Sequence, residues 1–506
     1  MRRRILVVIA LLASMLAAVV PAASAGPGGL TAGQRAVLYG IARDTWKFYG
    51  EDLDPHTHLP LDNLGPGAVR GTYTSAANIG VYLWAVVAAD DLHLINRARA
   101  RSMVASTLTE VRGLKRTDGF LYQWYDTSNG DVIRNPGDID CKTETTPAQD
   151  NCFFLSAVDN GWYASGLAVA RQALPELGGL INPLVSDLNF NIFYDNRPQI
   201  ACNTNPAISG NQPTGQMYGG FYVDQGPAGF HNGALYSDPR IAMYLGMGLH
   251  QMPGDVWWRT WRTLPPKQCA TDPDFSFQGQ WPVPGHWDDI RDPQSGKVFR
   301  VWEGHYVYPG TSLTYVPTWA GGMFEGLMAD QVVPETAWGP HSFGLADVRT
   351  VQVQMKYAQQ LGYPVWGISP SSTADDTGDY SGFGAEGLTL PTGQQLSQCT
   401  TCGTETTVTP HASVIALDVL PQQAYANIQT LRSRFPGVYT SDGGFFDAVN
   451  PTTGAIGHRR LVLDQSMIMA ALDNALDNGA LQRHFAADPT SWAARTYLGA
   501  ETMSIH

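Results

Sequence analysis

The chain has 506 residues, with 45 acidic and 32 basic side chains and a formal net charge of −13 at pH 7. An acidic chain of this kind argues against nucleic acid or an anionic membrane as a partner. Hydrophobic residues make up 44% of the sequence, with 18 Phe, 14 Trp and 21 Tyr, so the chain can bury a large core.

The first 25 residues have the pattern of a secretory signal peptide. Arginines follow Met1, an apolar run covers residues 5–20, and small residues lead to Ala25. We expect cleavage after Ala25 and a secreted, extracellular mature chain, with an uncleaved N-terminal anchor as the alternative. Nothing downstream is expected to span a membrane, because no later apolar stretch reaches about 18 residues.

Six cysteines in an exported chain fit three disulfides. The expected pairs, each bracketing one loop, are Cys141 with Cys152, Cys202 with Cys269, and Cys399 with Cys402. A zinc half-site or a redox motif is the alternative for the Cys399 and Cys402 pair, although the sequence holds no second motif of that spacing.

Helical periodicity recurs in pairs, with an apolar stretch followed by an amphipathic one. The paired ranges are 76–92 with 95–111, 156–174 with 180–193, 238–249 with 257–264, 318–328 with 348–361, 409–417 with 422–435, and 463–476 with 480–485. A further outer helix is expected over residues 30–49, capped by Thr31. About six helical hairpins predict a mainly α fold, an (α/α)6 toroid, in one domain over residues 26–506.

Two other helix starts carry cap signals. Thr409 followed by Pro410 is a strong start, and Asp464 is expected to cap the last long apolar helix. Helix starts rich in His, Asp, Gln and Ser suggest a shared polar site.

A long irregular region covers about residues 200–316 and is rich in Gly, Pro, Trp and Asp. Short strands are expected at residues 297–301 and 306–308. Trp281, Trp287 and Trp302 either roof a sugar-binding site or only pin the loop.

Several sequence blocks occur in the order found in a known family. They are Trp124-Tyr125-Asp126-Thr127, Ser156-Ala157-Val158-Asp159-Asn160-Gly161, Trp319-Ala320-Gly321-Gly322-Met323-Phe324-Glu325, Pro364-Val365-Trp366-Gly367-Ile368-Ser369, Val408-Thr409-Pro410-His411-Ala412-Ser413, Gly444-Phe445-Phe446-Asp447-Ala448-Val449 and Leu463-Asp464-Gln465. Over residues 70–490 the chain resembles the bacterial glucoamylase-like domain family, which includes secreted β-1,2-glucanases and the glycoside-processing domain of cyclic β-1,2-glucan synthases. The resemblance implies the same toroid and hydrolysis with inversion by a pair of acids.

Glycoside hydrolysis needs a proton donor and a second carboxylate that activates water or attacks carbon. The resemblance implies that Asp159 and Asp238, each at the start of an inner helix, are this catalytic pair, with Asp126 and Glu325 in reserve. Structural alternatives stay open: Asp159 and Asp238 as helix caps, Asp126 in a turn, and Glu325 in a buried ion pair.

A second set of residues is expected to bind sugar. The set comprises Trp124, Tyr125, Trp162, Glu303, His305, Trp366, Glu386 and His411. For Glu303 and His305 the alternative is a solvated loop. No cofactor is expected, although the acidic segment 375–379 offers either a calcium site or a turn.

The expected partner is a polysaccharide or oligosaccharide bound by a monomer. The favoured function is hydrolysis of a β-glucan, β-1,2-glucan above all, or of a related bacterial polysaccharide. Two other functions remain open: a noncatalytic glycan-binding protein, and a polysaccharide lyase built on a helical toroid.

Overall fold

The computed structural model describes residues 29–66, 70–134, 152–198, 214–263, 285–318, 321–385 and 407–505. It is mainly helical, as the periodicity predicts. The predicted signal peptide and every cysteine except Cys152 lie outside the described residues, so the leader and the three disulfide pairings stay predictions.

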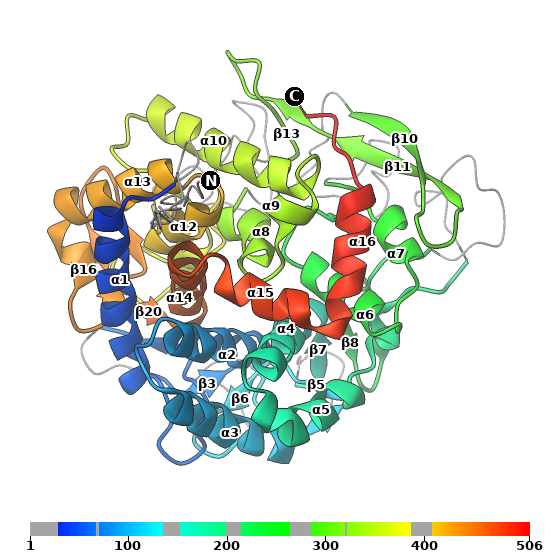
Figure 1. Cartoon of the computed structure of the whole chain (residues 1–506), viewed down its shortest axis with the longest axis horizontal. Helices are drawn as coiled ribbons and strands as arrows, with labels where there is room; N and C mark the ends of the chain where they lie inside the picture. The colour runs from blue at the N-terminus through cyan, green and yellow to red at the C-terminus, as the bar shows by residue number, and fades with distance from the viewer. Residues whose placement is uncertain are drawn as a thin grey trace, which may run out of the picture.

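Six inner helices form a ring (Figure 1). They are α2 (Ala76–Asp91), α4 (Ala157–Ala173), α6 (Arg240–Gly248), α8 (Met323–Leu327), α12 (Pro410–Ile415) and α14 (Val462–Leu476). Helix α2 packs on α4, α4 on α6, α8 on α12 and α12 on α14, and α14 packs on α2 to close the ring. Between α6 and α8 the Arg240 side chain makes the contact by donating to the carbonyl oxygens of Glu325 and Gly326.

Outer helices cover this ring. They are α1 (Ala32–Trp46) on α14, α3 (Arg97–Gly113) on α2, α5 (Gly178–Asp187) on α4, α10 (Phe343–Gln360) on α8, and α13 (Pro421–Arg434) on α12. Shorter helices are α7 (Asp255–Arg259), α9 (Glu335–Trp338), α15 (Ala480–Ala487) and α16 (Trp492–Ala500). The alternation of inner and outer helices is therefore confirmed, whereas α9 and α16 were not predicted.

The packing of α2 on α4 shows why the inner helices carry their sequences. Every residue of α2 from Ala76 to Ala89 is buried, because the helix has neighbours on all sides. The two backbones also approach closely at Gly80, where a Cβ atom would lie 2.3 Å from the Trp162 carbonyl oxygen. Glycine is required at this contact because any side chain would push the helices apart.

Short strands make up the rest of the fold. Their bounds are β1 (Asn63–Leu64), β2 (Arg70–Gly71), β3 (Tyr73–Thr74), β4 (Arg116–Thr117), β5 (Phe120–Leu121), β6 (Tyr125–Asp126), β7 (Phe154–Ser156), β8 (Gly220–Tyr222), β9 (Gly226–Pro227), β10 (Gly285–Arg291), β11 (Val298–Gly304), β12 (Tyr306–Val307), β13 (Thr314–Tyr315), β14 (Ser371–Ser372), β15 (Tyr380–Ser381), β16 (Tyr439–Thr440), β17 (Gly444–Phe445), β18 (Ala448–Val449), β19 (Ile456–Gly457) and β20 (Arg460–Leu461). Two three-stranded sheets have the orders β2-β1-β20 and β7-β8-β9, and the longest pairing is the antiparallel hairpin β10-β11.

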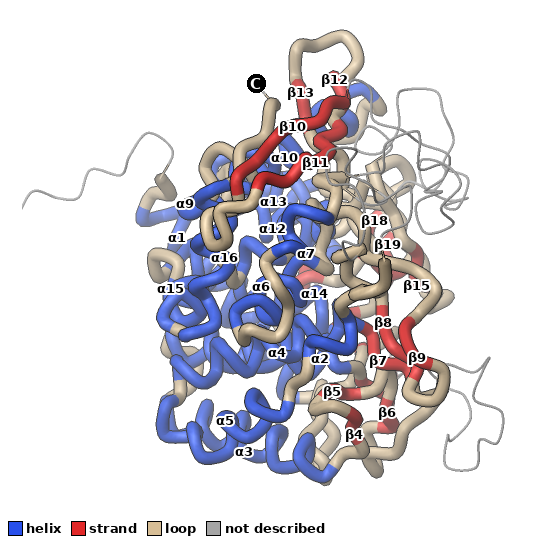
Figure 2. The backbone as a smooth tube through the Cα atoms, turned by 90° about the vertical axis from the view of Figure 1, so that its right-hand side faces the viewer, coloured by secondary structure: helices blue, strands red, loops and turns tan. Residues whose placement is uncertain are grey.

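The strands mark one end of the helix ring. Strands β3, β7 and β20 directly precede α2, α4 and α14, so these inner helices begin at the strand-bearing end. Figure 2 shows most strands gathered on one side of the helices, while α15 lies on the other side, packed on α2, α4 and α14. The first turns of the inner helices therefore meet beneath the strands and loops.

The predicted helix starts agree in part with the structure. Thr31 caps α1 in a capping box with Gln34, and Thr409 is the N-cap of α12 with Pro410 in the first turn. The predicted cap at Asp464 is wrong, because α14 begins at Val462 and Asp464 lies inside its first turn. Among the helices of the described ranges, none combines the length and the apolar character needed to cross a bilayer.

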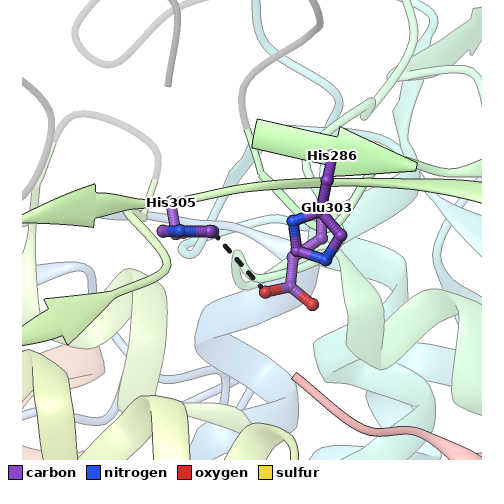
Figure 3. Close-up of side chains that lie close together, drawn as sticks. All are labelled: His286, Glu303 and His305. Atoms are coloured by element: carbon purple, nitrogen blue, oxygen red, sulfur yellow. Dashed lines mark ion pairs between the residues drawn. The ribbon is translucent and has the colours of Figure 1, made fainter. Parts of the chain in front are cut away.

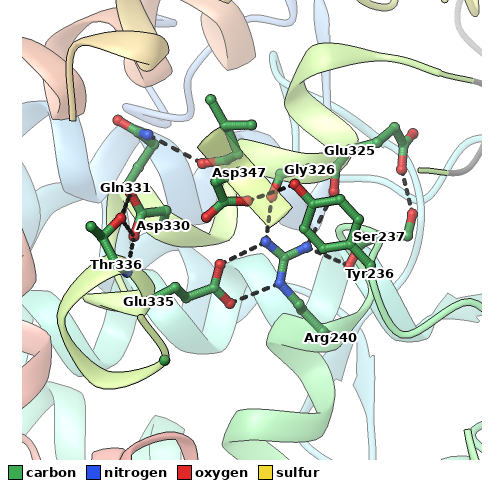
Figure 4. Close-up of polar contacts among 12 residues, drawn as sticks. Tyr236, Ser237, Arg240, Glu325, Gly326, Asp330, Gln331, Glu335, Thr336 and Asp347 are labelled. Atoms are coloured by element: carbon green, nitrogen blue, oxygen red, sulfur yellow. Dashed lines mark hydrogen bonds and ion pairs between the residues drawn. The ribbon is translucent and has the colours of Figure 1, made fainter. Parts of the chain in front are cut away.

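A fully buried ion pair ties α6 to α9. The Arg240 guanidinium donates to both carboxylate oxygens of Glu335 at 2.8 and 2.7 Å, and neither side chain is exposed. Figure 4 shows Arg240 at the centre of this network, with Tyr236 and Asp347 beside it. Each buried charge has a partner, so the network holds α6, α8 and α9 in register.

We expect Arg240→Met to lower the free energy of unfolding by about 3–5 kcal/mol, because it leaves Glu335 buried without its cation. Urea unfolding followed by tryptophan fluorescence measures this. The matched control is Arg97→Met, since Arg97 pairs with Glu176 on the surface at 49% side-chain exposure and is expected to contribute about 1 kcal/mol or less. Equal effects of the two variants would contradict the role given to Arg240.

Candidate active site

Polar side chains lie at or just before the first turn of each inner helix. They are Asn78 (α2), Asp159 (α4), Asp238 (α6), Glu325 (α8), His411 (α12) and Asp464 (α14). Because these helix starts meet at the strand-bearing end of the ring, the sequence brings several ionisable groups together there.

Asp238 and Glu325 form a pair of hydrogen-bonded carboxyl groups. Ser237 Oγ donates to Glu325 Oε2 at 2.6 Å, as Figure 4 shows. Burial and the charge of Asp238 raise the pKa of Glu325 well above its ordinary value. Two carboxyl groups this close cannot both be ionised at low cost, so the pair holds a proton at neutral pH, with Glu325 as its carrier.

Asp238 does not cap α6. The helix begins at Arg240 without a side-chain cap, which leaves the Asp238 carboxylate available for other contacts. The Trp162 side chain hydrogen-bonds to it, and this bond lowers the pKa of Asp238 against the larger raising effect of burial. Trp162 itself is held edge-on against Trp84, with ring centroids 5.5 Å apart.

Asp159 lies in the first turn of α4 and is half-buried. Ser156, rather than Asp159, is the N-cap, and its Oγ accepts from the Asp159 backbone N–H at 3.2 Å. Burial, with a further contribution from the charge of Asp238, raises the pKa of Asp159 to about 6. Asp159 is thus a carboxyl group that can exchange a proton near neutral pH, within electrostatic reach of Asp238.

A second buried group consists of His411, Asp447 and Asp464. His411 Nδ1 lies 2.6 Å from Thr409 Oγ1 and 3.0 Å from Asp464 Oδ2. Burial lowers the pKa of His411 to about 4, so the imidazole is neutral at pH 7. Burial also raises the pKa of Asp464 to about 7. Burial and the charge of Asp464 together raise the pKa of Asp447 well above its ordinary value.

Tyr380 on β15 lies within electrostatic reach of both groups. Burial of its hydroxyl raises its pKa well above the ordinary value, and four carboxylates add to this effect. They are Asp464, Asp447, Glu325 and Asp62. About half of the residue is exposed (52%), so Tyr380 lies within electrostatic reach of the carboxylates and also borders solvent.

Asp62, which directly precedes β1, is a further carboxylate near these groups. Its oxygens accept from the Asn78 and Asn63 side-chain amides at 2.9 and 2.8 Å. Its charge also contributes to the raised pKa of Asp464. We call Asp62, Asp159, Asp238, Glu325, His411, Asp447, Asp464 and Tyr380 the carboxylate cluster.

Two predicted residues near β6 have structural contacts instead. Asp126 Oδ1 accepts from the Ser128 backbone N–H at 2.8 Å and from the Ser128 hydroxyl at 2.6 Å, which is the turn alternative. Tyr125 is fully buried, and its hydroxyl donates to the Lys115 carbonyl oxygen at 2.8 Å. The prediction that Tyr125 contacts sugar is therefore corrected: it is a core residue.

Three more residues predicted to contact sugar lie in different places. Trp124 is half-buried and stacks edge-on against Tyr73, whose hydroxyl hydrogen-bonds to Asp62, so it borders the carboxylate cluster. Trp366 instead lines an outer groove beside α10, and its backbone N–H donates to Asn427 of α13 at 3.2 Å. Glu386 lies outside the described residues.

Glu303 and His305 lie on and just after β11, and both are buried rather than solvated. The backbone N–H of Ser504, near the C-terminus, donates to Glu303. Their partners therefore belong to the β10-β11 hairpin and the C-terminal segment, not to the carboxylate cluster.

Sequence reasoning missed Asp62, Tyr380 and the pairing of Asp447 with Asp464. Asp447 and Asp464 both stand in the family-like blocks, which was the available signal. Asp62 and Tyr380 carry no comparable signal, because each lies in a short loop or strand far along the chain from the other carboxyl groups of the cluster.

Three groups of described residues have a donor arrangement suited to a metal ion: His286-Glu303-His305, His411-Asp447-Asp464 and Asp330-Glu335-Asp347. In the last group Arg240 already supplies the positive charge. The acidic segment 375–379 is not among them: Asp375 accepts from Thr377 and Thr373, and Asp376 accepts from His458, so its carboxylates hold a turn.

Comparison with known proteins supports the predicted resemblance. Residues 301–489 match the Glycoamylase family, described as "Putative glucoamylase". A cyclic β-(1,2)-glucan synthase of Rhizobium meliloti (strain 1021) is 33% identical over 194 residues, which is 36% of this chain but 6% of that protein.

Two solved structures share the fold at low sequence identity. An endo-β-1,2-glucanase from Chitinophaga pinensis, in complex with sophorotriose and glucose, has a TM-score of 0.62 at 14% identity and covers 93% of this chain and 98% of its own. A β-1,2-glucanase from Parabacteroides distasonis has a TM-score of 0.65 at 13% identity, covering 93% of this chain and 60% of its own. The predicted mainly α, glucoamylase-like fold is thereby confirmed.

The raised pKa of Asp464 predicts a pH dependence of stability. The folded state holds this proton up to about pH 7, whereas an unfolded Asp loses it near pH 4, so the folded state loses stability as the pH rises between these values. Asparagine cannot ionise, so we expect the free energy of unfolding of Asp464→Asn to fall by about 2 kcal/mol less than that of the wild type between pH 5 and pH 8.

Urea unfolding at both pH values measures this effect. Asp477→Asn is the matched control, because that side chain is 46% exposed on the same stretch of chain. If Asp464→Asn and the wild type lose stability in parallel, the buried proton is not at Asp464.

Proposed function

We propose that this protein is a secreted glycoside hydrolase that cleaves a β-glucan, with β-1,2-glucan favoured, and inverts the anomeric carbon. The observation that carries the proposal is the electrostatic coupling of two half-buried carboxyl groups: burial and the charge of Asp238 raise the pKa of Asp159 to about 6. Secretion is supported by the signal-peptide pattern of residues 1–25. The fold shared with proteins named as β-1,2-glucanases supports the choice of polymer.

In this mechanism Asp159 is the general acid. A group with a pKa near 6 is protonated in enough molecules at neutral pH and still gives up its proton readily. Asp159 donates its proton to the glycosidic oxygen as the bond to the anomeric carbon breaks. The charge of Asp238 keeps the proton on Asp159 until the substrate accepts it.

Asp238 is the general base. Its hydrogen bonds from Trp162 and Ser237 and the charge of Arg240 all favour the ionised form, while the neighbouring Glu325 carries the shared proton. Ionised Asp238 takes a proton from a water molecule, whose oxygen attacks the anomeric carbon from the face opposite the leaving group. Inversion follows from this single displacement.

The carboxylate cluster extends beyond the reacting pair. Neutral His411 and the protonated forms of Asp447 and Asp464 present both donors and acceptors at the same end of the ring. Sugar hydroxyls require both kinds of group. We assign this side of the cluster, with Tyr380 and Trp124, to binding the sugar rings.

The first test is product release from β-1,2-glucan, other β- and α-glucans, and arabinan. We expect wild-type protein to release reducing sugar from a β-glucan, and Asp159→Asn and Asp238→Asn each to reduce the rate by roughly 10²–10⁴-fold. Asp187→Asn is the control, because Asp187 is an exposed carboxylate at the end of α5, and this variant should keep the wild-type rate.

Other outcomes of this assay contradict the proposal in distinct ways. Binding of a glycan without release by wild-type protein would indicate a noncatalytic binding protein. A product with a new ultraviolet-absorbing double bond would indicate a lyase.

The hydrogen bond from Trp162 predicts a pH effect. The rate should fall at high pH as Asp159 loses its proton, near pH 6, and at low pH as Asp238 gains one. Trp162→Phe removes a hydrogen bond that lowers the pKa of Asp238, so the pKa of Asp238 should rise. The low-pH limb of the pH–rate profile, where Asp238 becomes protonated, should therefore move to higher pH.

Trp84→Phe is the matched control for this variant, because Trp84 packs against Trp162 and is buried to the same degree. It should leave the low-pH limb in place. A uniform loss of rate in Trp162→Phe, with both limbs unmoved, would show that Trp162 only packs.

A further inference from the structure

Two histidines and a glutamate meet at one end of the β10-β11 hairpin, as Figure 3 shows. His286 on β10 lies directly opposite Glu303 on β11, and His305 follows Glu303 by two residues. One donor atom from each side chain lies within 4.8 Å of the donor atoms of the other two. The mechanism proposed above uses none of these residues.

The buried side of this group contains an unsatisfied nitrogen atom. His305 is 8% exposed, and its Nδ1 atom is buried without a hydrogen-bond partner among the described residues. Nδ1 faces Glu303 Oε1 at 3.7 Å, which is too long for a hydrogen bond. Burying a polar nitrogen without a partner costs stability, so the geometry calls for a group between the two atoms.

The separation suits a shared metal ion. A zinc ion lies about 2.0–2.1 Å from an imidazole nitrogen and about 2.0–2.2 Å from a carboxylate oxygen, which at a tetrahedral angle places the two donors about 3.4 Å apart. Two imidazoles and one carboxylate form a donor set typical of zinc and of neighbouring transition metals, whereas calcium and magnesium prefer oxygen alone.

Surrounding contacts orient the donors. The Ser504 backbone N–H donates to both Glu303 oxygens, at 2.8 and 3.0 Å, which fixes the carboxylate from behind. Hydrogen bonds of this kind commonly hold metal-binding carboxylates in place. His286 is the open side of the group: its side chain is 36% exposed, and its Nε2 atom lies 2.9 Å from Asp288 Oδ2 and 3.3 Å from Ser504 Oγ.

We propose that His286, Glu303 and His305 bind one divalent transition-metal ion, of which Zn²⁺ is the representative, with Asp288, Ser504 or water completing the coordination. The ion enters from the solvent side at His286. Once bound, it fastens the β10-β11 hairpin to the C-terminal segment that contains Ser504. This site is independent of the proposed hydrolase activity.

The test uses untagged full-length mature protein, freed of metal with a chelator, and titrates Zn²⁺ by calorimetry. We expect one Zn²⁺ per chain and a thermal unfolding midpoint that rises by several degrees in its presence. Co²⁺ substituted at the site should give a visible absorption spectrum with nitrogen ligation. Both readouts are separate from catalysis.

Variants locate the ion. His286→Ala and His305→Ala should each weaken Zn²⁺ binding at least about 10-fold and abolish the rise in the midpoint. His56→Ala is the matched control, because His56 is exposed in a loop far from the hairpin in sequence, and it should bind as wild type does. His286→Ala changes a partly exposed side chain, and circular dichroism of the metal-free variants verifies that they are folded.

Three results would overturn the proposal. The first is no Zn²⁺ binding by wild-type protein, in which case the three side chains form only a hydrogen-bonding group. The second is equal binding by wild type and both histidine variants. The third is binding that survives these variants but is lost in His411→Asn, which would place the ion at the carboxylate cluster.

Discussion

Carboxyl groups buried against one another at one end of a helix ring are the constraint on which this structure depends. Asp238 with Glu325, and Asp447 with Asp464, each bring two acids within hydrogen-bonding distance in a largely desolvated place. Neither pair can hold two full charges there, so protons stay bound at pH values where exposed acids have lost them. A bound proton of this kind is what the proposed reaction requires for the glycosidic oxygen.

The scaffold explains how such a costly arrangement is kept. Arg240 joins α6 to α8 through main-chain carbonyl groups and to α9 through Glu335, all without exposure to solvent. Asp238 stands two residues before Arg240, and Glu325 is one of the carbonyl partners. The Arg240–Glu335 ion pair therefore helps to position both Asp238 and Glu325. Raised pKa values are common at functional sites, because catalytic acids and bases need pKa values matched to their task.

Much of the fold could be predicted from the sequence, because the inner helices are apolar on all sides and the outer helices on one side. Asp159 and Asp238 are predicted from their places at helix starts together with the family resemblance, and their catalytic roles stay a proposal. Long-range neighbours were harder to predict: Asp447 follows β17, Asp464 lies in α14, and only the folded chain brings them together. Aromatic residues are ambiguous for another reason. The prediction that Tyr125 contacts sugar is wrong, because a core uses the same side chains, whereas Trp366 lines an outer groove and its sugar contact stays a prediction.

The most direct test of the account is a crystal structure of Asp238→Asn with a bound β-1,2-gluco-oligosaccharide. The account predicts sugar rings at the strand-bearing end of the helix ring, with a glycosidic oxygen within hydrogen-bond reach of Asp159 and hydroxyl groups on His411 and Asp464. A sugar bound in the outer groove beside Trp366, or one whose glycosidic bonds all lie out of reach of Asp159, would contradict it.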